Sequence, residues 1–296
     1  MIVPMGSRLV LATLLLVACD ARLHTGGGAT TDATTTDSPF RSNDDAPAID
    51  APAMLGPWGT PQLIPGASDP ALAEDDGTPN QALTELYFGQ VNANTNKDLY
   101  WMVRATATDP WGPKTLLYQS ANNDESPRLS LDELTLYFGR NGDIYQMTRT
   151  AVGQPWGTAT IVPGVNVVGN NTYEKWLAVC QGGYYIVSRD ADLYEGTLPN
   201  PPTKIASLST GGSEISTWLS TDCKTVMFAR TPTGGQSDIY ISTRTATTDP
   251  WPAATALPDF NTATSNEEDP WMSNDMRSFV FASNAAGTKD LYLSTR

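Results

Sequence analysis

Acidic residues recur in each unit of a repeated pattern along this chain of 296 residues, and their carboxyl groups offer the clearest chemistry. They are Asp69, Glu125, Glu174, Glu214 and the adjacent Glu268 and Asp269. Two carboxyl groups held a few ångströms apart can hydrolyse a glycosidic bond, one as the acid and the other as base or nucleophile. A ring of carboxylates can also attract a divalent cation or a basic segment of a partner protein. The third interpretation is structural, with each acid accepting hydrogen bonds from a nearby loop or facing solvent.

Histidine chemistry is excluded from the part of the chain that we expect to fold. The only histidine is His24, which lies in a segment that reads as a flexible tether. A Ser-His-Asp or Cys-His arrangement, and a zinc or iron site with histidine ligands, therefore cannot form in the folded part. We assign no catalytic residue, and the only cofactor considered is a divalent cation at the acidic mouth.

The charge balance argues against a nucleic-acid partner. The net charge is −14, from 32 acidic and 18 basic residues. Binding to a phosphate backbone needs a basic footprint, which this composition lacks. An acidic surface instead favours a basic patch on another protein.

The N-terminus predicts export to a bacterial cell envelope. Arg8 precedes an apolar stretch, Leu9 to Ala18, that is too short to span a bilayer and is typical of a signal peptide. The stretch ends in Leu16-Val17-Ala18-Cys19, which resembles the bacterial lipobox. This resemblance implies that residues 1–19 form a lipoprotein signal and that Cys19 is lipidated, on the periplasmic or the outer-surface face. The alternative is a cleaved signal with an incidental cysteine.

The composition then divides the rest of the chain into two parts. Residues 20–57 are rich in Thr, Ala, Gly, Asp, Ser and Pro and carry few large apolar side chains. Such a segment cannot bury enough surface to offset its chain entropy, so it is predicted to be a tether. Residues 58–296 are predicted to be the folded domain.

A tripeptide of the form Asp-x-Tyr occurs five times in the folded domain, which marks it as a repeat protein. The tripeptides begin at Asp98, Asp143, Asp192, Asp238 and Asp290, at spacings of 45, 49, 46 and 52 residues. A period of this length with short β-type segments is typical of a β-propeller. Each unit fits four short strands, and we align the innermost strands at Pro70–Ala73, Pro127–Ser130, Lys175–Ala178, Thr217–Ser220 and Pro270–Ser273. Each acid above therefore lies near the start of an innermost strand, at one mouth of the channel.

The two ends of the domain predict how the ring closes. Trp58 to Ile64 reads as a fourth strand with nothing before it, and the last unit has no fourth strand of its own. We therefore expect an all-β, five-bladed propeller in which the N-terminal strand pairs with the last blade. The alternative is a six-bladed ring, which would need another unit of this kind.

The repeat resembles the WD-repeat-like units of TolB-type propellers. The resemblance is carried by the segment from Ser126 to Phe138 followed by Asp143-Ile144-Tyr145, and it extends to all five units. It is weakest in the third, where Cys180-Gln181-Gly182 replaces a Ser-x-Asp turn. TolB itself has six blades and an extra N-terminal domain. The resemblance implies a periplasmic or surface scaffold that binds protein partners, and it implies no chemistry.

Cys180 and Cys223 remain once Cys19 is assigned to the anchor. The compartment is oxidising, and both cysteines fall in turns between the first and second strands of adjacent units. A disulfide between the third and fourth blades is one interpretation. Two separate thiols are the other, because equivalent turns need not bring the Cα atoms within about 7 Å.

Two functions remain open. The first is a lipid-anchored, noncatalytic propeller that binds an envelope or extracellular protein. The second is a carbohydrate-active propeller, either a lectin or a glycoside hydrolase, that uses the acidic mouth. Tryptophans could stack on sugars if exposed, but a tryptophan at a repeated position indicates packing between blades.

Overall fold

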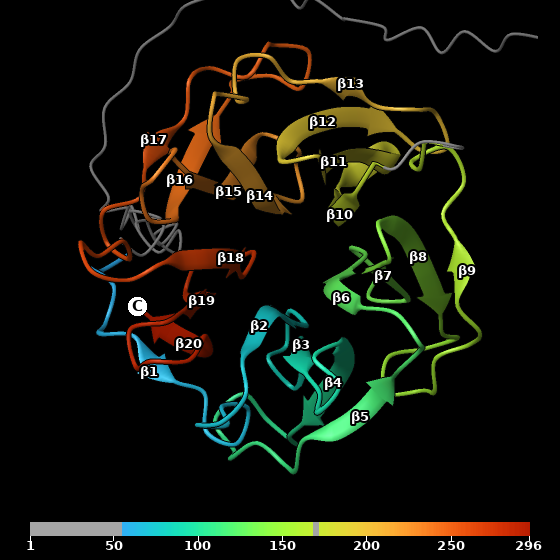
Figure 1. Ribbon diagram of the computed structural model, residues 1–296, viewed down its shortest axis with the longest axis vertical. Coiled ribbons are helices and arrows are strands. Elements are labelled where there is room, and N and C mark those ends of the chain that lie inside the picture. The colour runs from blue at the N-terminus through green and yellow to red at the C-terminus, as the bar shows by residue number, and fades with distance from the viewer. Residues whose placement is uncertain (1–54, 168–171) are drawn as a thin grey trace, which may run out of the picture. The chain divides into compact units, whose positions relative to one another are not determined.

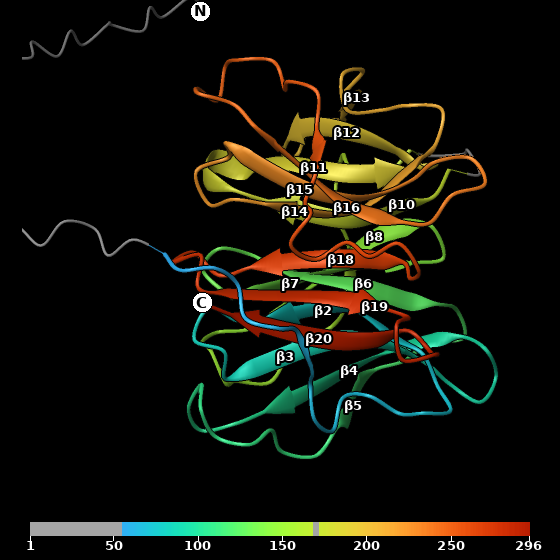
Figure 2. The same ribbon diagram turned by 90° about the vertical axis from the view of Figure 1, so that its left-hand side faces the viewer.

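The protein is a five-bladed β-propeller, which confirms the predicted fold class. The computed structural model describes residues 55–167 and 172–296, so Cys19 and nearly all of the predicted tether lie outside the described residues. Five antiparallel sheets of four strands each stand around a central channel (Figure 1). In the side view the strands run roughly along the channel and the loops gather at its two ends (Figure 2). Nothing in the described part of the chain forms a sixth blade.

The strands of each blade follow one another outward from the channel. Blade 1 comprises β2 (Glu74–Pro79), β3 (Glu85–Val91), β4 (Lys97–Val103) and β5 (Thr115–Tyr118). Blade 2 comprises β6 (Asp124–Leu129), β7 (Thr135–Arg140), β8 (Asp143–Thr148) and β9 (Thr160–Ile161). Blade 3 comprises β10 (Glu174–Val179), β11 (Tyr184–Arg189), β12 (Asp192–Thr197) and β13 (Thr203–Lys204), with the short 3-10 helix η1 (Gln181–Gly183) between its first two strands.

The last two blades complete the ring. Blade 4 comprises β14 (Ser213–Leu219), β15 (Thr225–Thr231), β16 (Asp238–Thr243) and β17 (Thr255–Ala256). Blade 5 comprises β18 (Glu267–Met272), β19 (Ser278–Ser283), β20 (Asp290–Thr295) and, as its outermost strand, β1 (Gln62–Leu63). The described residues contain no helix long and apolar enough to cross a bilayer.

The sequence pattern explains why the second and third strands form the core. Each second strand carries a run of apolar and aromatic residues, and Leu86, Tyr87 and Phe88 in β3 are fully buried. The tyrosine of each Asp-x-Tyr tripeptide lies in the third strand, where Tyr100 stacks on Phe88 of the same blade. A continuous run of buried side chains of this kind suits a sheet that is covered on both faces.

The N-terminal strand closes the ring, as predicted. Gln62 pairs with Leu293 and Leu63 with Tyr292 in an antiparallel ladder between β1 and β20 (Figure 1). The N–H of Gly59 also donates to the carbonyl of Thr295 at 2.9 Å. Equivalent bonds from Gly112 to Val103 and from Gly157 to Thr148, each 2.8 Å long, hold the fourth strands of blades 1 and 2. Blade 5 is therefore built like its neighbours although its outer strand comes from the other end of the domain.

Tryptophans at the repeated positions pack against arginines. Trp58, Trp111, Trp156 and Trp251 each lead into a fourth strand, and each ring lies beneath a guanidinium group, at 4.0 to 4.4 Å from ring centroid to Cζ. An arginine over an indole ring stabilises a fold by about 0.5–1 kcal/mol at an exposed site, and by more when water is excluded. These four rings are thus structural.

One expected strand position was wrong. The innermost strand of blade 1 begins at Glu74, so the predicted segment Pro70–Ala73 lies in the preceding loop. The prediction matched Pro70 to Pro127 and Pro270, whereas the residue of blade 1 at that position is Gly77. This shift changes which acids of blade 1 face the channel.

Cys180 and Cys223 form a disulfide bond in the structure, with Cα atoms 5.6 Å apart. The bond joins the turn after β10 to the turn between β14 and β15, and so links blades 3 and 4 covalently.

Candidate functional site

Each innermost strand contains an irregularity near its start, at the third residue in four blades and at the fourth residue in blade 4. The ladder between the first and second strands shifts register there in all five blades. The residue at this position has a positive φ in every blade, and the five are Asp76, Ser126, Trp176, Ser216 and Asp269. A β-bulge of this kind re-aims a side chain. The channel thus receives an unusual ring of side chains from one repeated backbone feature.

An acid at the first or second residue of these strands anchors the loop that leads into the strand. Glu214 accepts hydrogen bonds from the N–H of Thr210, at 3.0 Å, and from Nε of Arg230, at 2.8 Å. Glu174 likewise pairs with Arg189, 2.6 Å away, and accepts from the hydroxyl of Thr172. Burial raises the pKa of Glu174. These two predicted mouth residues therefore support the fold, and the structural interpretation describes them best.

Asp69 lies in a loop and takes no place at the channel. Its backbone N–H donates to the carboxylate of Glu74, 3.0 Å away, and Glu74 is the fully buried acid that begins β2. Lys114 also reaches Glu74, at 3.1 Å. Glu74 therefore holds in blade 1 the position that Glu174 and Glu214 hold in theirs.

The structure brings Glu125, Glu268 and Asp269 together with acids and lysines that the sequence analysis missed. Lys97 lies 2.6 Å from Asp75 and 3.7 Å from Glu125. Lys175 lies 2.7 Å from Glu125, and Lys289 pairs with Glu268. Lysine ammonium groups therefore lie beside the acids that we considered for a divalent cation. The described residues contain no cluster of three or more acids, histidines or cysteines arranged for a metal ion.

A signal for these contacts was present in the chain. Lys97 and Lys289 each directly precede the aspartate of an Asp-x-Tyr tripeptide. The side chain of Lys97 crosses β3 at Gly89 to reach Asp75 on the innermost strand. A Cβ atom at Gly89 would lie 3.3 Å from Oδ1 of Asp75. Gly89, which pairs with Leu99, thus leaves room for the side chain of Lys97 to cross β3 toward the channel.

The deepest carboxyl groups differ in their acidity. Burial raises the pKa of Asp75 to about 7, and the nearby charge of Asp76 adds to the rise. Burial also raises the pKa of Asp269 well above its ordinary value, with Asp76 contributing again. For Asp76 burial acts in the same direction, but the charge of Lys97 and hydrogen bonds with Asp269 and Trp176 outweigh it and lower the pKa. The pKa of Asp76 is therefore lowered, whereas the pKa values of Asp75 and Asp269 are raised.

Hydrogen bonds across the channel close it at this depth. Nε1 of Trp176 in blade 3 donates to Asp76 in blade 1. Nε of Arg128 in blade 2 donates to the carbonyl of Thr217 in blade 4, at 3.1 Å. Asp76 and Asp269 are 0% and 1% exposed. No substrate the size of a sugar ring can reach these carboxyl groups without displacing the side chains that cover them.

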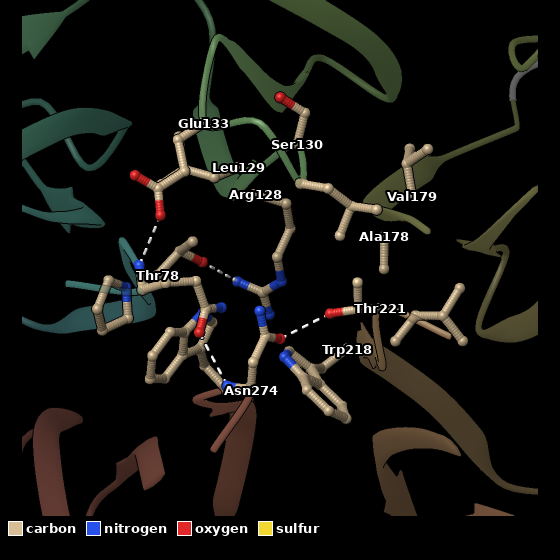
Figure 3. Close-up of a pocket in the computed structure, with 15 residues that line it drawn as sticks. Thr78, Arg128, Leu129, Ser130, Glu133, Ala178, Val179, Trp218, Thr221 and Asn274 are labelled. Carbon is tan, nitrogen blue, oxygen red and sulfur yellow. Dashed lines mark hydrogen bonds between the residues drawn. The ribbon is translucent and has the colours of Figure 1, made fainter. Parts of the chain in front are cut away.

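A small cavity lies at the other end of the channel, where the turns between first and second strands meet (Figure 3). Its volume is about 60 Å³, and Arg128, Trp218 and Trp271 line it. The turns around it are bonded to one another: Oε1 of Gln81 accepts from the N–H of Asn274, and Thr221 donates to the side chain of Asn274. This end of the channel is therefore a polar ring of turns around a buried guanidinium group.

A larger groove runs along the outer rim. It has a volume of about 770 Å³ and lies between β1 and the loop from Thr108 to Trp111. Leu63, which is 42% exposed, and Leu293 contribute apolar surface to it. Because β1 is the edge of its sheet, the groove also borders unpaired backbone groups.

Comparison with known proteins shows a shared fold. No known family and no curated protein matches the sequence. Among solved structures, TolB from Acinetobacter baumannii has 17% sequence identity and a TM-score of 0.48, over 75% of this chain and 54% of that one. The chain thus spans about half the length of that protein. The alpha-L-arabinofuranosidase PaAbf62A from Podospora anserina, in complex with cellotriose, has 14% identity and a TM-score of 0.54, over 81% of this chain and 96% of that one. The GH62 alpha-L-arabinofuranosidase catalytic domain from Coprinopsis cinerea has 12% identity and a TM-score of 0.53, over 81% and 97%.

These similarities define the class of the molecule, a β-propeller, and go no further. At such low identity they show the fold alone, and that fold serves noncatalytic scaffolds and glycoside hydrolases alike.

Proposed function

We propose that this protein is a noncatalytic propeller that binds a partner protein in the bacterial envelope. The observation that carries the proposal is the state of the channel acids. Asp75, Glu125 and Glu268 are each paired with a lysine. Asp76 and Asp269 are buried, and Asp76 accepts a hydrogen bond from Trp176. A catalytic pair needs carboxyl groups that a substrate can reach. The channel acids of this protein instead make contacts that hold the blades together.

The location is part of the proposal and rests on the lipobox-like sequence that ends in Cys19. A lipid anchor would hold the propeller at a membrane, on its periplasmic or outer-surface face. Replacing Cys19 by Ser should move the protein from the membrane fraction to the soluble fraction, or leave the signal uncleaved. Unchanged fractionation with an unchanged mature mass would contradict the anchor and leave the propeller's role untouched.

The charge of the chain indicates the chemistry of the partner. With a net charge of −14, the protein attracts a basic protein surface and repels nucleic acid. We expect such a partner to bind at one of two hollows in the surface, the rim groove beside β1 or the cavity ringed by turns.

A carbohydrate-active propeller is the second candidate, and one observation favours it. Burial and neighbouring charges push the pKa values of Asp76 and Asp269 in opposite directions. Pairs of carboxyl groups separated in this way mark the acid and base of some glycoside hydrolases. The burial of both groups is the argument against this candidate.

One experiment separates the two. The membrane-anchored protein is crosslinked in its own envelope and its partners are identified, and the purified protein is incubated with arabinan and arabinoxylan and applied to a glycan array. We expect a recurrent protein crosslink and no sugar release. Sugar release that is lost in Asp76→Asn and Asp269→Asn, but kept in the surface control Asp259→Asn, would establish the second candidate instead.

A further inference from the structure

The side chain of Arg128 stands at the base of the cavity ringed by turns (Figure 3). It projects from β6 and is 3% exposed. Its hydrogen bonds go to the carbonyl groups of Thr217, Asp76 and Pro127 and to the hydroxyl of Thr78, at 2.8 to 3.3 Å. All four acceptors are neutral, so the guanidinium charge has no direct counterion among them.

One nitrogen of this group has no partner. Nη2 of Arg128 is buried and makes no hydrogen bond. A buried donor left unsatisfied costs about 1–3 kcal/mol, and more when it belongs to a charged group. Native proteins contain few such groups, and each calls for an explanation such as a bound water or ion.

Arg128 differs from the other arginines of the described residues. Arg140, Arg149, Arg189 and Arg230 form ion pairs with acids, and Arg104, Arg244 and Arg296 lie over tryptophan rings. Arg277 is exposed. Arg128 is buried and has neither kind of partner in the part of the chain that the structure describes. The repeat therefore supplies a partner for every buried arginine but this one.

Nearby acids do not neutralise Arg128 directly. Burial lowers its pKa, and the charges of Asp269, Asp76 and Asp75 only partly offset that effect. The carboxylate of Asp76 turns away, since it accepts from the N–H of Ser126 and the ring of Trp176. Glu133 also lines the cavity, but its Oε1 accepts from the N–H of Gln81. An anion in the cavity would therefore lie beside the guanidinium charge of Arg128, which the groups of the protein stabilise only in part.

The cavity has the size and walls for a carboxyl group. Its volume of about 60 Å³ is enough for a few water molecules or a carboxylate, and exposed residues such as Asn274 surround its opening. Trp218, Thr221 and Asn274 also line an adjoining groove of about 410 Å³, which includes Met272 and the 45% exposed Met276. A carboxylate at Arg128 would therefore have room beside it for the apolar chain that carries it.

We propose that this cavity binds a carboxylate group, which accepts a hydrogen bond from Nη2 of Arg128. The group belongs either to a small free carboxylic acid or to a single acidic side chain within the otherwise basic surface of the partner protein, and the second source rests on the proposed function. A charge-assisted bond of this kind is short and about twice as strong as a neutral one.

The test uses acetate on the full-length protein at constant ionic strength, with chloride as the balancing salt. Binding is followed by the fluorescence of the tryptophans that line the cavity and by the NMR signal of the Arg128 side-chain N–H. We expect a saturable change in both. Arg128→Met should abolish it, and Arg128→Lys should weaken it because the ammonium cannot reproduce the position of Nη2.

A second pair of variants guards against loss of folding. Leu131 lies at the mouth of the cavity and is 44% exposed, so Leu131→Asp should leave the fold intact and weaken acetate binding several-fold by repulsion. Val103 is also 44% exposed but lies outside the cavity, so Val103→Asp should leave binding unchanged.

The source of the carboxylate is decided with two blocked tripeptides, Gly-Glu-Gly and Gly-Gln-Gly. Tighter binding of the Glu peptide than of acetate supports an acidic side chain of a partner, whereas acetate binding with no difference between the peptides supports a free acid. If neither acetate nor the Glu peptide gives a saturable change, the cavity holds water only and the proposal is overturned. That result would leave the capture of a partner protein at another surface intact.

Discussion

The most direct test of the ring is the replacement of Ile64 by Ala. Ile64 is 2% exposed and its N–H donates to the carbonyl of Leu291 at 2.9 Å, so it fastens β1 to the rest of blade 5. Ile205 is the equivalent residue of blade 3, is 4% exposed and donates to Leu193 at 2.8 Å. Truncating a buried isoleucine to alanine costs about 2–5 kcal/mol. Both variants should therefore lower the free energy of unfolding by similar amounts.

The two variants should differ in local opening. In Ile205→Ala the outer strand stays tied into the middle of the folded chain, whereas in Ile64→Ala only noncovalent contacts hold β1 in place. Besides the ladder, these contacts include the bond from Gly59 to Thr295, at 2.9 Å, and the packing of Trp58 on Phe260, with ring centroids 5.3 Å apart. If the lost free energy, 2 kcal/mol at the lower end, acts entirely on the detachment of β1, the population of molecules with β1 detached rises roughly 30-fold.

Native-state hydrogen exchange measures this difference. The amides of Gly59 and of residue 64 should exchange roughly 30-fold faster or more in Ile64→Ala, under conditions in which most amides of blades 2 and 3 are unaffected. In Ile205→Ala the same two amides should change only as far as global unfolding changes. Equal acceleration of Gly59 in the two variants would refute the idea that β1 is a separately detachable strand.

Three further predictions concern stability. Replacing both Cys180 and Cys223 by Ser should cost about 2–4 kcal/mol, seen as a lower Tm that no longer responds to reductant, and an unchanged Tm would contradict a stabilising bond. Burial raises the pKa of Asp75 to about 7, so the folded state binds more protons than the unfolded state between about pH 4 and 7. The free energy of unfolding should therefore fall as the pH rises through that range. Asp75→Asn should flatten this pH dependence in urea titrations, and an equally steep fall in the variant would refute the assignment. Gly164→Ala should lower the free energy of unfolding by more than about 3 kcal/mol, because the new Cβ would lie 1.6 Å from the carbonyl oxygen of Pro199. Gly153 is the control, since its φ of 78° is close to the 79° of Gly164 but no atom lies within 4 Å of its Cβ position. Gly153→Ala should cost about 1 kcal/mol in the same denaturation assay.

Much of the fold could be predicted because each repeat states the same pattern again. The Asp-x-Tyr tripeptides fall in the third strands of all five blades, and the unmatched segment from Trp58 to Ile64 predicted the pairing of β1 with β20. Both inferences depend on the order of elements along the chain, which a repeated sequence reveals directly.

The candidate site was less predictable because it depends on positions within single strands. Aligning Pro70 with the prolines of other units misplaced β2, so Asp69 was chosen and Asp75 and Asp76 were passed over. Arg128 was missed for a different reason. Its burial without a counterion arises because strands from three blades meet at the axis, and the spacing of residues along the sequence does not reveal such a contact.

The closure of the ring by β1 also means that the order of blades in the chain is arbitrary. The N–H of Gly59 and the carbonyl of Thr295 lie 2.9 Å apart, so a short linker could join Arg296 to Trp58, and the exposed loop that contains Gly153 could be opened to make new termini. Such a circular permutant would have the same blades and the same channel, but its outermost strand in blade 5 would be covalently continuous with β20. The noncovalent seam would then lie in blade 2, and the detachable strand would move with it.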